Sequence, residues 1–246
     1  MRGSPQAQVT MNPPTRYAPY AACCIVVSPP GAALPRQHIL FFRRSHYIAW
    51  DVEGDGIAAG YPREIEADWP GLLGAFPGKA LCGALHVREW GRRIHFQFEG
   101  ESRCATWDLE TGALLPDRPE LVDLLPGEPA REPGLVLAYA QAKDGRPVVY
   151  GFRGTQAACW RVLGDCAPAF QDMSYPQAIR DGWPEGLTVA PDCAVFAHWM
   201  ARSDAHPNRK IYYFLGDVYL RWDVTSHTRN YRLDIPSGWK NWPRFD

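Results

Sequence analysis

Residues 211–223 read Ile211-Tyr-Tyr-Phe-Leu-Gly-Asp-Val-Tyr-Leu-Arg-Trp222-Asp223, and this stretch decides the fold. Two runs rich in aromatic and β-branched residues flank a Gly-Asp pair. Such runs, joined by a short glycine-containing turn, are typical of a β-hairpin. The stretch therefore predicts two antiparallel strands, the second of which ends at Trp222.

The same pattern occurs three more times along the chain, at residues 39–51, 94–108 and 148–161. In each copy an apolar strand is followed by a turn and by a second strand that ends in tryptophan. The four tryptophans Trp50, Trp107, Trp160 and Trp222 are 57, 53 and 62 residues apart. A pattern that returns at such intervals is the sequence signature of a repeat architecture.

Two further features belong to each repeat. Downstream of the first hairpin, Ile65 and Trp69 stand four residues apart and are followed by a proline. Residues 175–184 repeat this pattern, and residues 231–239 repeat it without the proline. Residues 121–127 are a degenerate copy. Apolar residues four apart share one face of a short helix. Upstream, residues 22–25, 81–84, 136–139 and 192–195 are short runs dominated by small side chains. Each unit therefore predicts three strands, an outer fourth strand and a short helix.

Four such units occupy residues 20–246, with boundaries expected at about 20–74, 75–131, 132–186 and 187–246. Radial packing of four sheets leaves only short edges exposed. We therefore expect one all-β domain, a four-bladed β-propeller with four strands per blade and short helices between blades. Residues 1–19 are polar and proline-rich, and we expect them to be disordered; the first four resemble residues left by an expression tag.

Composition narrows the classes of function. The chain has 26 basic and 27 acidic residues, so a strongly basic surface for nucleic acid is not expected. No apolar run is long enough to span a membrane, and none resembles a signal peptide, which favours a cytoplasmic location. Seven cysteines, an odd number, favour reduced thiols over a disulfide framework. No nucleophile-elbow or phosphate-loop motif is present, so we do not expect an enzyme.

Together, these features resemble the hemopexin repeat. The resemblance is most complete in residues 60–71, which contain Gly-Tyr-Pro-Arg-Glu-Ile and Trp-Pro-Gly, and in residues 211–223. It covers residues 20–246 and implies the hemopexin fold. Single-chain proteins of this fold, such as the legume albumin-2 group and related bacterial proteins, are the closest in type.

The resemblance also implies a central channel in which backbone carbonyls of the first strands hold a calcium or sodium ion. Carbonyl oxygens are ligands that Ca²⁺ accepts. By position in the repeat, the candidate metal-binding residues are the first-strand residues Ala22, Leu81, Val136 and Asp192, each followed by the next residue of its strand, Cys23, Cys82, Leu137 and Cys193.

Three of those cysteines, Cys23, Cys82 and Cys193, align at one position of three repeats in this reading. They could form a thiol ring for a soft metal or a haem iron. The favoured alternative is that cysteine is a small apolar filler in tightly packed strands.

Histidines and tryptophans supply the remaining candidate ligand-binding residues. His86 and His198 come late in their first strands, where they could reach a channel mouth, and His206 lies in a polar loop. Tryptophans that follow the repeat are expected in the core between blades. Trp90, Trp199 and Trp242 are off this pattern, and we expect them at a ligand or partner surface.

These observations predict a non-catalytic binding protein. The first hypothesis is a small ligand, haem or a polyamine such as spermine, bound at the channel mouth together with a metal ion. The alternative is a protein-interaction module, or a defence or toxin component, that uses the rim of the propeller. Either protein could be a monomer or a dimer.

Overall fold

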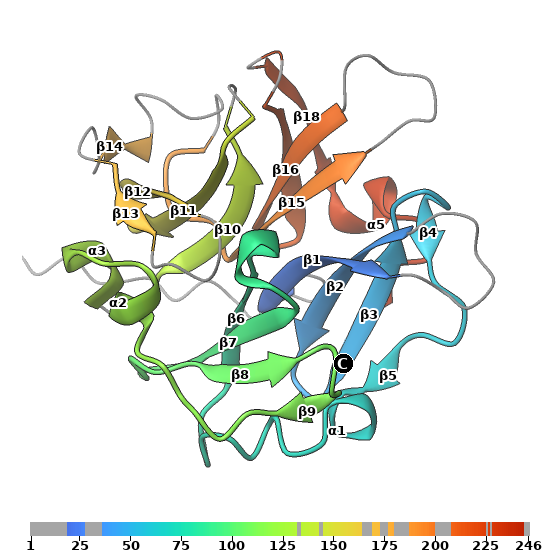
Figure 1. Ribbon diagram of the computed structural model, residues 1–246. Helices are drawn as coiled ribbons and strands as arrows, with labels where there is room; N and C mark the ends of the chain where they lie inside the picture. The colour runs from blue at the N-terminus through green and yellow to red at the C-terminus, as the bar shows by residue number, and fades with distance from the viewer. Residues whose placement is uncertain are drawn as a thin grey trace, which may run out of the picture.

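The computed structural model describes residues 19–27, 36–131, 134–142, 145–163, 169–172, 177–179, 187–199, 208–224, 226 and 228–243. It contains four antiparallel sheets (Figure 1). The first sheet is formed by β1 (Ala21–Val27), β2 (Arg36–Arg43), β3 (His46–Asp51), β4 (Gly56–Ile57) and β5 (Arg63–Glu64). The second is formed by β6 (Leu81–His86), β7 (Arg93–Phe98), β8 (Ala105–Asp108) and β9 (Ala113–Leu114).

The third sheet is formed by β10 (Val136–Gln141), β11 (Pro147–Arg153), β12 (Gln156–Arg161), β13 (Phe170–Gln171) and β14 (Gln177–Ala178). The fourth is formed by β15 (Cys193–Trp199), β16 (Asn208–Leu215), β17 (Val218–Asp223) and β18 (Thr228–Asp234). The strand order follows the chain, with the first strand of each sheet at one edge. We call these sheets blades 1 to 4.

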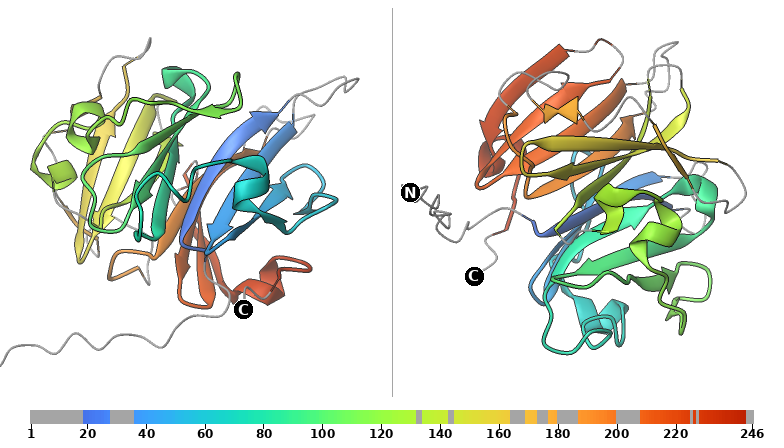
Figure 2. Two further views of the ribbon diagram at one scale, coloured as in Figure 1. Left: turned by 90° about the horizontal axis from the view of Figure 1, so that it is seen from below. Right: turned by 90° about the vertical axis from the view of Figure 1, so that its left-hand side faces the viewer.

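The four blades surround one axis. Their first strands, β1, β6, β10 and β15, meet in the middle of Figure 1 and contact one another around the ring. Figure 2 shows the blue first blade beside the red last blade, so the ring is closed by blades 4 and 1. The prediction of a four-bladed β-propeller is confirmed.

Short helices connect or cap the blades: η1 (Arg88–Trp90), α1 (Ile65–Asp68), α2 (Leu121–Leu124), α3 (Glu128–Arg131) and α5 (Ile235–Gly238). Ile65 and Ile235, the first residues of α1 and α5, are completely buried, which anchors each helix to its blade. Across the part of the chain that the structure describes, no helix is long and apolar enough to cross a membrane.

Strand register follows the repeated tryptophans. In every blade the tryptophan of the third strand pairs with a β-branched residue of the second strand, which pairs in turn with a residue of the innermost strand. The series are Trp50–Ile39–Cys24, Trp107–Ile94–His86, Trp160–Val149–Tyr139 and Trp222–Ile211–Phe196. Cys24, His86, Tyr139 and Phe196 are therefore the structurally equivalent residues of the four innermost strands.

This register shows that the predicted alignment of the cysteines is wrong. Cys23 precedes the equivalent position by one residue, Cys193 by three and Cys82 by four. Small side chains do not distinguish one strand position from the next, and a bulge between Leu81 and Gly83 shifts blade 2 further. The apparent repeat of cysteine was therefore a coincidence of small residues.

The hydrophobic core is divided into four clusters, one between each pair of neighbouring blades. The tryptophan after each helix packs on the third-strand tryptophan of the next blade: the ring centroids of Trp69 and Trp107 are 5.1 Å apart, and those of Trp239 and Trp50 are 4.6 Å apart. Leu125 replaces this tryptophan in blade 2 and lies in one cluster with Trp160. The predicted core role is confirmed for Trp50, Trp69, Trp107, Trp160 and Trp239, while Trp222 is partly buried and packs against the core between blades 3 and 4; Trp183 lies outside the described ranges.

Two tryptophans expected at a surface lie elsewhere. Trp90 is 5% exposed and belongs to the core between blades 2 and 3, and Trp242 is 7% exposed and belongs to the core between blades 4 and 1. Each lies in a cluster that contains a repeated tryptophan, Trp160 for Trp90 and Trp239 for Trp242. Removing such a large apolar side chain from water stabilises the folded protein. The expected surface position is therefore wrong for both.

Candidate functional site

The channel along the propeller axis is lined by three consecutive residues from each innermost strand. These are Ala22, Cys23 and Cys24 of β1, Ala84, Leu85 and His86 of β6, Leu137, Ala138 and Tyr139 of β10, and Ala194, Val195 and Phe196 of β15. The free space between them is about 10 Å³, measured to the centre of a water-sized sphere. This is the space of one water molecule or one small ion.

The structure places the predicted metal-binding residues in two groups. Ala22, Cys23 and Leu137 line the channel. Leu81, Val136, Asp192, Cys82 and Cys193 precede the lining residues of their blades. The carboxylate of Asp192 accepts a hydrogen bond from the backbone N–H of Gly216 at 2.6 Å, which holds the β16–β17 turn. Asp192 therefore has a local structural partner in the hairpin of its own blade.

One end of the channel is polar. His86 Nδ1 donates a hydrogen bond to the carbonyl oxygen of Cys24 at 2.9 Å, which joins the innermost strands of the neighbouring blades 2 and 1. Burial lowers the pKa of His86, so its imidazole is neutral at neutral pH. A neutral imidazole in this position does not repel a cation in the channel.

The helix η1 lies over the same end of the channel, where Figure 1 draws it as a coil that follows β6. Glu89 of this helix accepts a hydrogen bond from the hydroxyl group of Tyr139 at 3.0 Å through Oε1. Its other oxygen, Oε2, is buried and has no hydrogen-bond partner among the residues that the structure describes. Burial and the neighbouring Glu89 carboxylate raise the pKa of Tyr139.

Sequence reasoning missed Glu89, because a single acid between two strands has no distinguishing pattern. Of the histidines and tryptophans that it named as ligand-binding candidates, His86 lines the channel. His198 and Trp199 are the last two residues of β15, and the structure describes their backbone but not their side chains. His206 lies outside the described residues.

The channel fits a small hard cation better than a soft metal or a haem. Within the described ranges each innermost strand pairs on one side only, so its other edge has backbone N–H and C=O groups outside the sheet ladder, and carbonyl oxygens are ligands that hard cations accept. Burial raises the pKa of Cys24 to about 12 and that of Cys23 well above its ordinary value, so these thiols stay protonated and are poor metal ligands. No group of three His, Cys, Asp or Glu side chains among the described residues could hold a metal. A haem macrocycle does not fit in a space of about 10 Å³.

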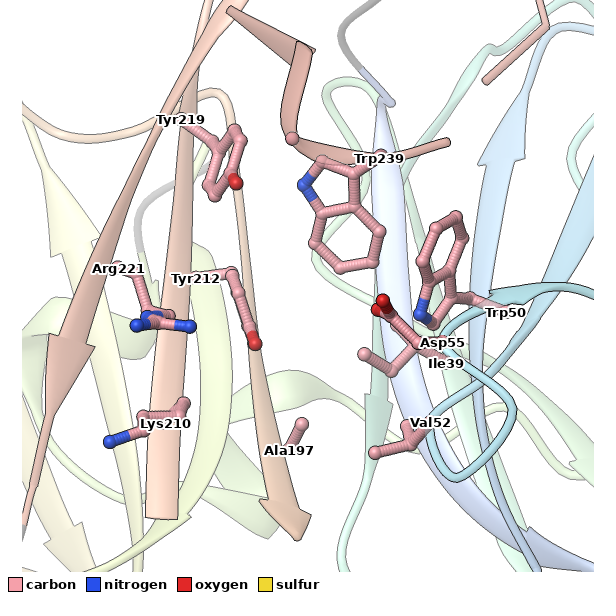
Figure 3. Close-up of a pocket in the computed structure, with 11 residues that line it drawn as sticks. Ile39, Trp50, Val52, Asp55, Ala197, Lys210, Tyr212, Tyr219, Arg221 and Trp239 are labelled. Atoms are coloured by element: carbon pink, nitrogen blue, oxygen red, sulfur yellow. The ribbon is translucent and has the colours of Figure 1, made fainter. Parts of the chain in front are cut away.

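A larger cavity of about 280 Å³ lies at the seam between blades 4 and 1 (Figure 3). We call it the seam cavity. Blade 1 contributes Ile39, Trp50, Val52 and Asp55, and blade 4 contributes Ala197, Lys210, Tyr212, Tyr219, Arg221, Gly238 and Trp239. Its floor is apolar and aromatic, and three charged side chains lie at its edge. Sequence reasoning had assigned Trp50 and Trp239 to the core alone.

The residue before the second tryptophan of the repeat differs between blades 1 and 4, the two blades that line this cavity. In blade 1, Tyr47 donates a hydrogen bond to Asp68 at 2.8 Å, and Asp68 forms an ion pair with Arg63 at 2.6 Å. Blade 4 has glycine at the position of Asp68. A Cβ atom on Gly238 would lie 1.9 Å from the hydroxyl oxygen of Tyr219, so only glycine allows this approach.

The sequence matches no protein-family profile and no curated protein sequence. Several solved structures are similar to it. The hemopexin fold protein CP4 from cow pea has a TM-score of 0.60 at 17% identity, over 90% of this chain and 96% of that one. The seed albumin LS24 from Lathyrus sativus has a TM-score of 0.58 at 16% identity, over 90% and 94% of the two chains. A plant lectin with two metal binding sites from Cicer arietinum has a TM-score of 0.58 at 16% identity, over 90% and 95%.

The chain is thus a hemopexin-fold protein, built as a single four-bladed propeller. Within that fold its structure resembles the legume seed albumins of the albumin-2 type, and the likeness is one of structure alone. At 16–17% identity, it establishes the fold of this chain and not its ligand.

Proposed function

We propose that this protein is a non-catalytic binding protein that holds one small cation at the polar end of its central channel. The cation is a calcium or sodium ion, or one ammonium group of an amine such as spermine. The observation that carries the proposal is the buried Oε2 atom of Glu89, which lacks a hydrogen-bond partner among the described residues. A buried carboxylate is costly unless a positive charge or a donor compensates it.

The surroundings of Glu89 support a positive ligand. The open edges of the four innermost strands have backbone carbonyl groups outside the sheet ladders, and carbonyl oxygens are the ligands that hard cations prefer. The rings of Tyr139 and Phe196, with centroids 6.4 Å apart, meet edge to face beside the channel. Aromatic faces attract ammonium groups by cation–π interaction.

Haem is not part of this proposal, since the channel has room for one ion only. A role as a protein-interaction module at the rim stays a prediction.

The test is the substitution Glu89→Gln, which removes the charge and preserves the shape of the side chain. We expect calorimetric titration of the wild type with calcium chloride, sodium chloride or spermine to show one site, and the variant to bind about 10- to 100-fold more weakly. Calcium and sodium on one side and spermine on the other distinguish a metal ion from an ammonium group.

Glu110→Gln is the matched control, because Glu110 is an exposed acid of the same blade. Its affinity should equal that of the wild type. Wild-type protein that binds none of the three ligands, or equal affinity in Glu89→Gln, would rule out the proposed cation site.

A further inference from the structure

The seam cavity has the size and floor of a small-molecule site. Its volume of about 280 Å³ lies just below the range of about 300–1,000 Å³ that is usual for such sites. Ile39, Val52 and Ala197 form apolar parts of its lining, and each is buried. Aromatic rings lie on both sides, with Trp50 on blade 1 and Tyr212 on blade 4 (Figure 3). A flat apolar body suits this space, because rings stack on or meet aromatic neighbours favourably.

Trp239, which lines the same cavity, carries a buried hydrogen-bond donor. Trp239 is 3% exposed, and its Nε1 atom has no hydrogen-bond partner among the described residues. Figure 3 shows this indole nitrogen turned toward the blade 4 wall, on the side of Tyr219. Because a buried N–H without an acceptor is unfavourable, a ligand that brings an oxygen atom to it would be stabilised. Trp69, the equivalent residue in blade 1, also has a buried Nε1 atom without a hydrogen-bond partner among the described residues, so what singles out Trp239 is its place in the lining of the seam cavity.

The charged side chains at the edge are mostly cationic. Lys210 of β16 and Arg221 of β17 lie on the blade 4 wall, and Asp55 is the one acid among the lining residues. Lys210 forms an ion pair with Asp223, and Asp55 forms one with Lys240 at 3.6 Å. Arginine binds carboxylate and related anions with two parallel hydrogen bonds, which gives both strength and orientation.

From these observations we propose that the seam cavity binds a small organic anion with a flat apolar body, such as an aromatic carboxylate. The ring lies between the aromatic side chains of blades 1 and 4. The carboxylate accepts hydrogen bonds from Trp239 Nε1 and from the guanidinium group of Arg221. The site is separate from the central channel and does not depend on the cation proposed there.

Three probes of one shape test the charge of the ligand: 2-naphthoate, the neutral 2-naphthylmethanol and the cationic 2-naphthylmethylamine. Binding is followed by calorimetry and by quenching of tryptophan fluorescence, since Trp50 and Trp239 line the cavity. We expect 2-naphthoate to bind at one site, the alcohol at least about tenfold more weakly, and the amine more weakly still. Equal binding of all three probes, or no binding of 2-naphthoate at millimolar concentration, would overturn the proposal.

Two variants test the two donors. Arg221→Gln should weaken 2-naphthoate by about tenfold or more and leave the alcohol nearly unchanged. Trp239→Phe keeps an aromatic ring and removes the N–H group, so it provides an independent test if Arg221→Gln fails to fold. Unchanged 2-naphthoate affinity in a folded form of either variant would contradict the role given to that donor.

Two controls complete the experiment. Arg232→Gln changes an exposed arginine of the same blade outside the cavity and should bind 2-naphthoate as the wild type does. Glu89→Gln should also bind it normally, because that substitution affects the channel alone. A loss of 2-naphthoate binding in either control would mean that the probe does not occupy the seam cavity.

Discussion

Replacing Trp239 by alanine is expected to lower the free energy of unfolding by about 3–5 kcal/mol, the usual cost of removing a fully buried large aromatic side chain. The ring of Trp239 lies between the last blade and the first. Its centroid is 4.6–5.9 Å from the centroids of six other aromatic rings, those of Trp50, Tyr212, Phe41, Trp242, Tyr219 and Phe214. The contacts with Trp50 and Phe41 of blade 1 cross the seam that closes the ring, and the other four pack Trp239 within its own blade.

Urea unfolding followed by tryptophan fluorescence and circular dichroism measures this loss. Trp239→Leu should lie between the alanine variant and the wild type, because blade 2 uses Leu125 at the equivalent position. The matched control is Leu233→Ala in the same blade: Leu233 is 38% exposed, and its loss should cost less than about 0.5 kcal/mol. A cost below about 1 kcal/mol for Trp239→Ala would show that the seam is not a packed core.

Lowering the pH from about 6.5 to about 4 is expected to destabilise the protein by on the order of 3 kcal/mol through His95 alone. His95 is 5% exposed, and its Nδ1 atom is 3.1 Å from the hydroxyl oxygen of Thr106. Burial, with smaller effects of Arg93 and His86, lowers its pKa from 6.5 to about 4. Between these values the unfolded chain binds a proton at this histidine and the folded protein does not. The contribution of the neutral His95 to the free energy of unfolding is therefore fully present above about pH 6.5 and is lost as the pH falls toward 4.

Denaturant unfolding at a series of pH values between 7 and 4 measures this dependence. His95→Gln has an amide that can hydrogen-bond Thr106 and does not titrate, so its stability should fall less steeply over the same range. His46→Gln replaces an exposed histidine and should follow the wild-type curve. A His95→Gln curve parallel to the wild-type curve would show that this histidine does not resist protonation in the folded protein.

The blade architecture could be predicted from local patterns. The hairpin of residues 211–223 and its three copies contain alternating apolar residues, turns and a tryptophan at a constant place, and each of these reports local geometry. The tryptophans then paired with β-branched residues in every blade, as at Trp50 and Ile39. Such large side chains determine the register because a slip of one residue would turn them out of the core.

The innermost strands could not be aligned in this way. Their side chains are small, so neighbouring registers bury nearly the same surface, and the bulge between Leu81 and Gly83 has no visible signal in the sequence. The candidate metal residues were for this reason displaced along the strands. Glu89 could not be identified from the sequence, because its hydrogen-bond partner Tyr139 is fifty positions away in the chain.

The sequence by itself therefore determined the repeat, the number of blades and the place of the repeated tryptophans, since these follow from patterns that recur in each hairpin. Only the tertiary structure decided which residues line the channel and that a cavity separates blades 4 and 1. Both depend on contacts between blades, which bring together side chains far apart in the chain, such as Trp50 and Trp239.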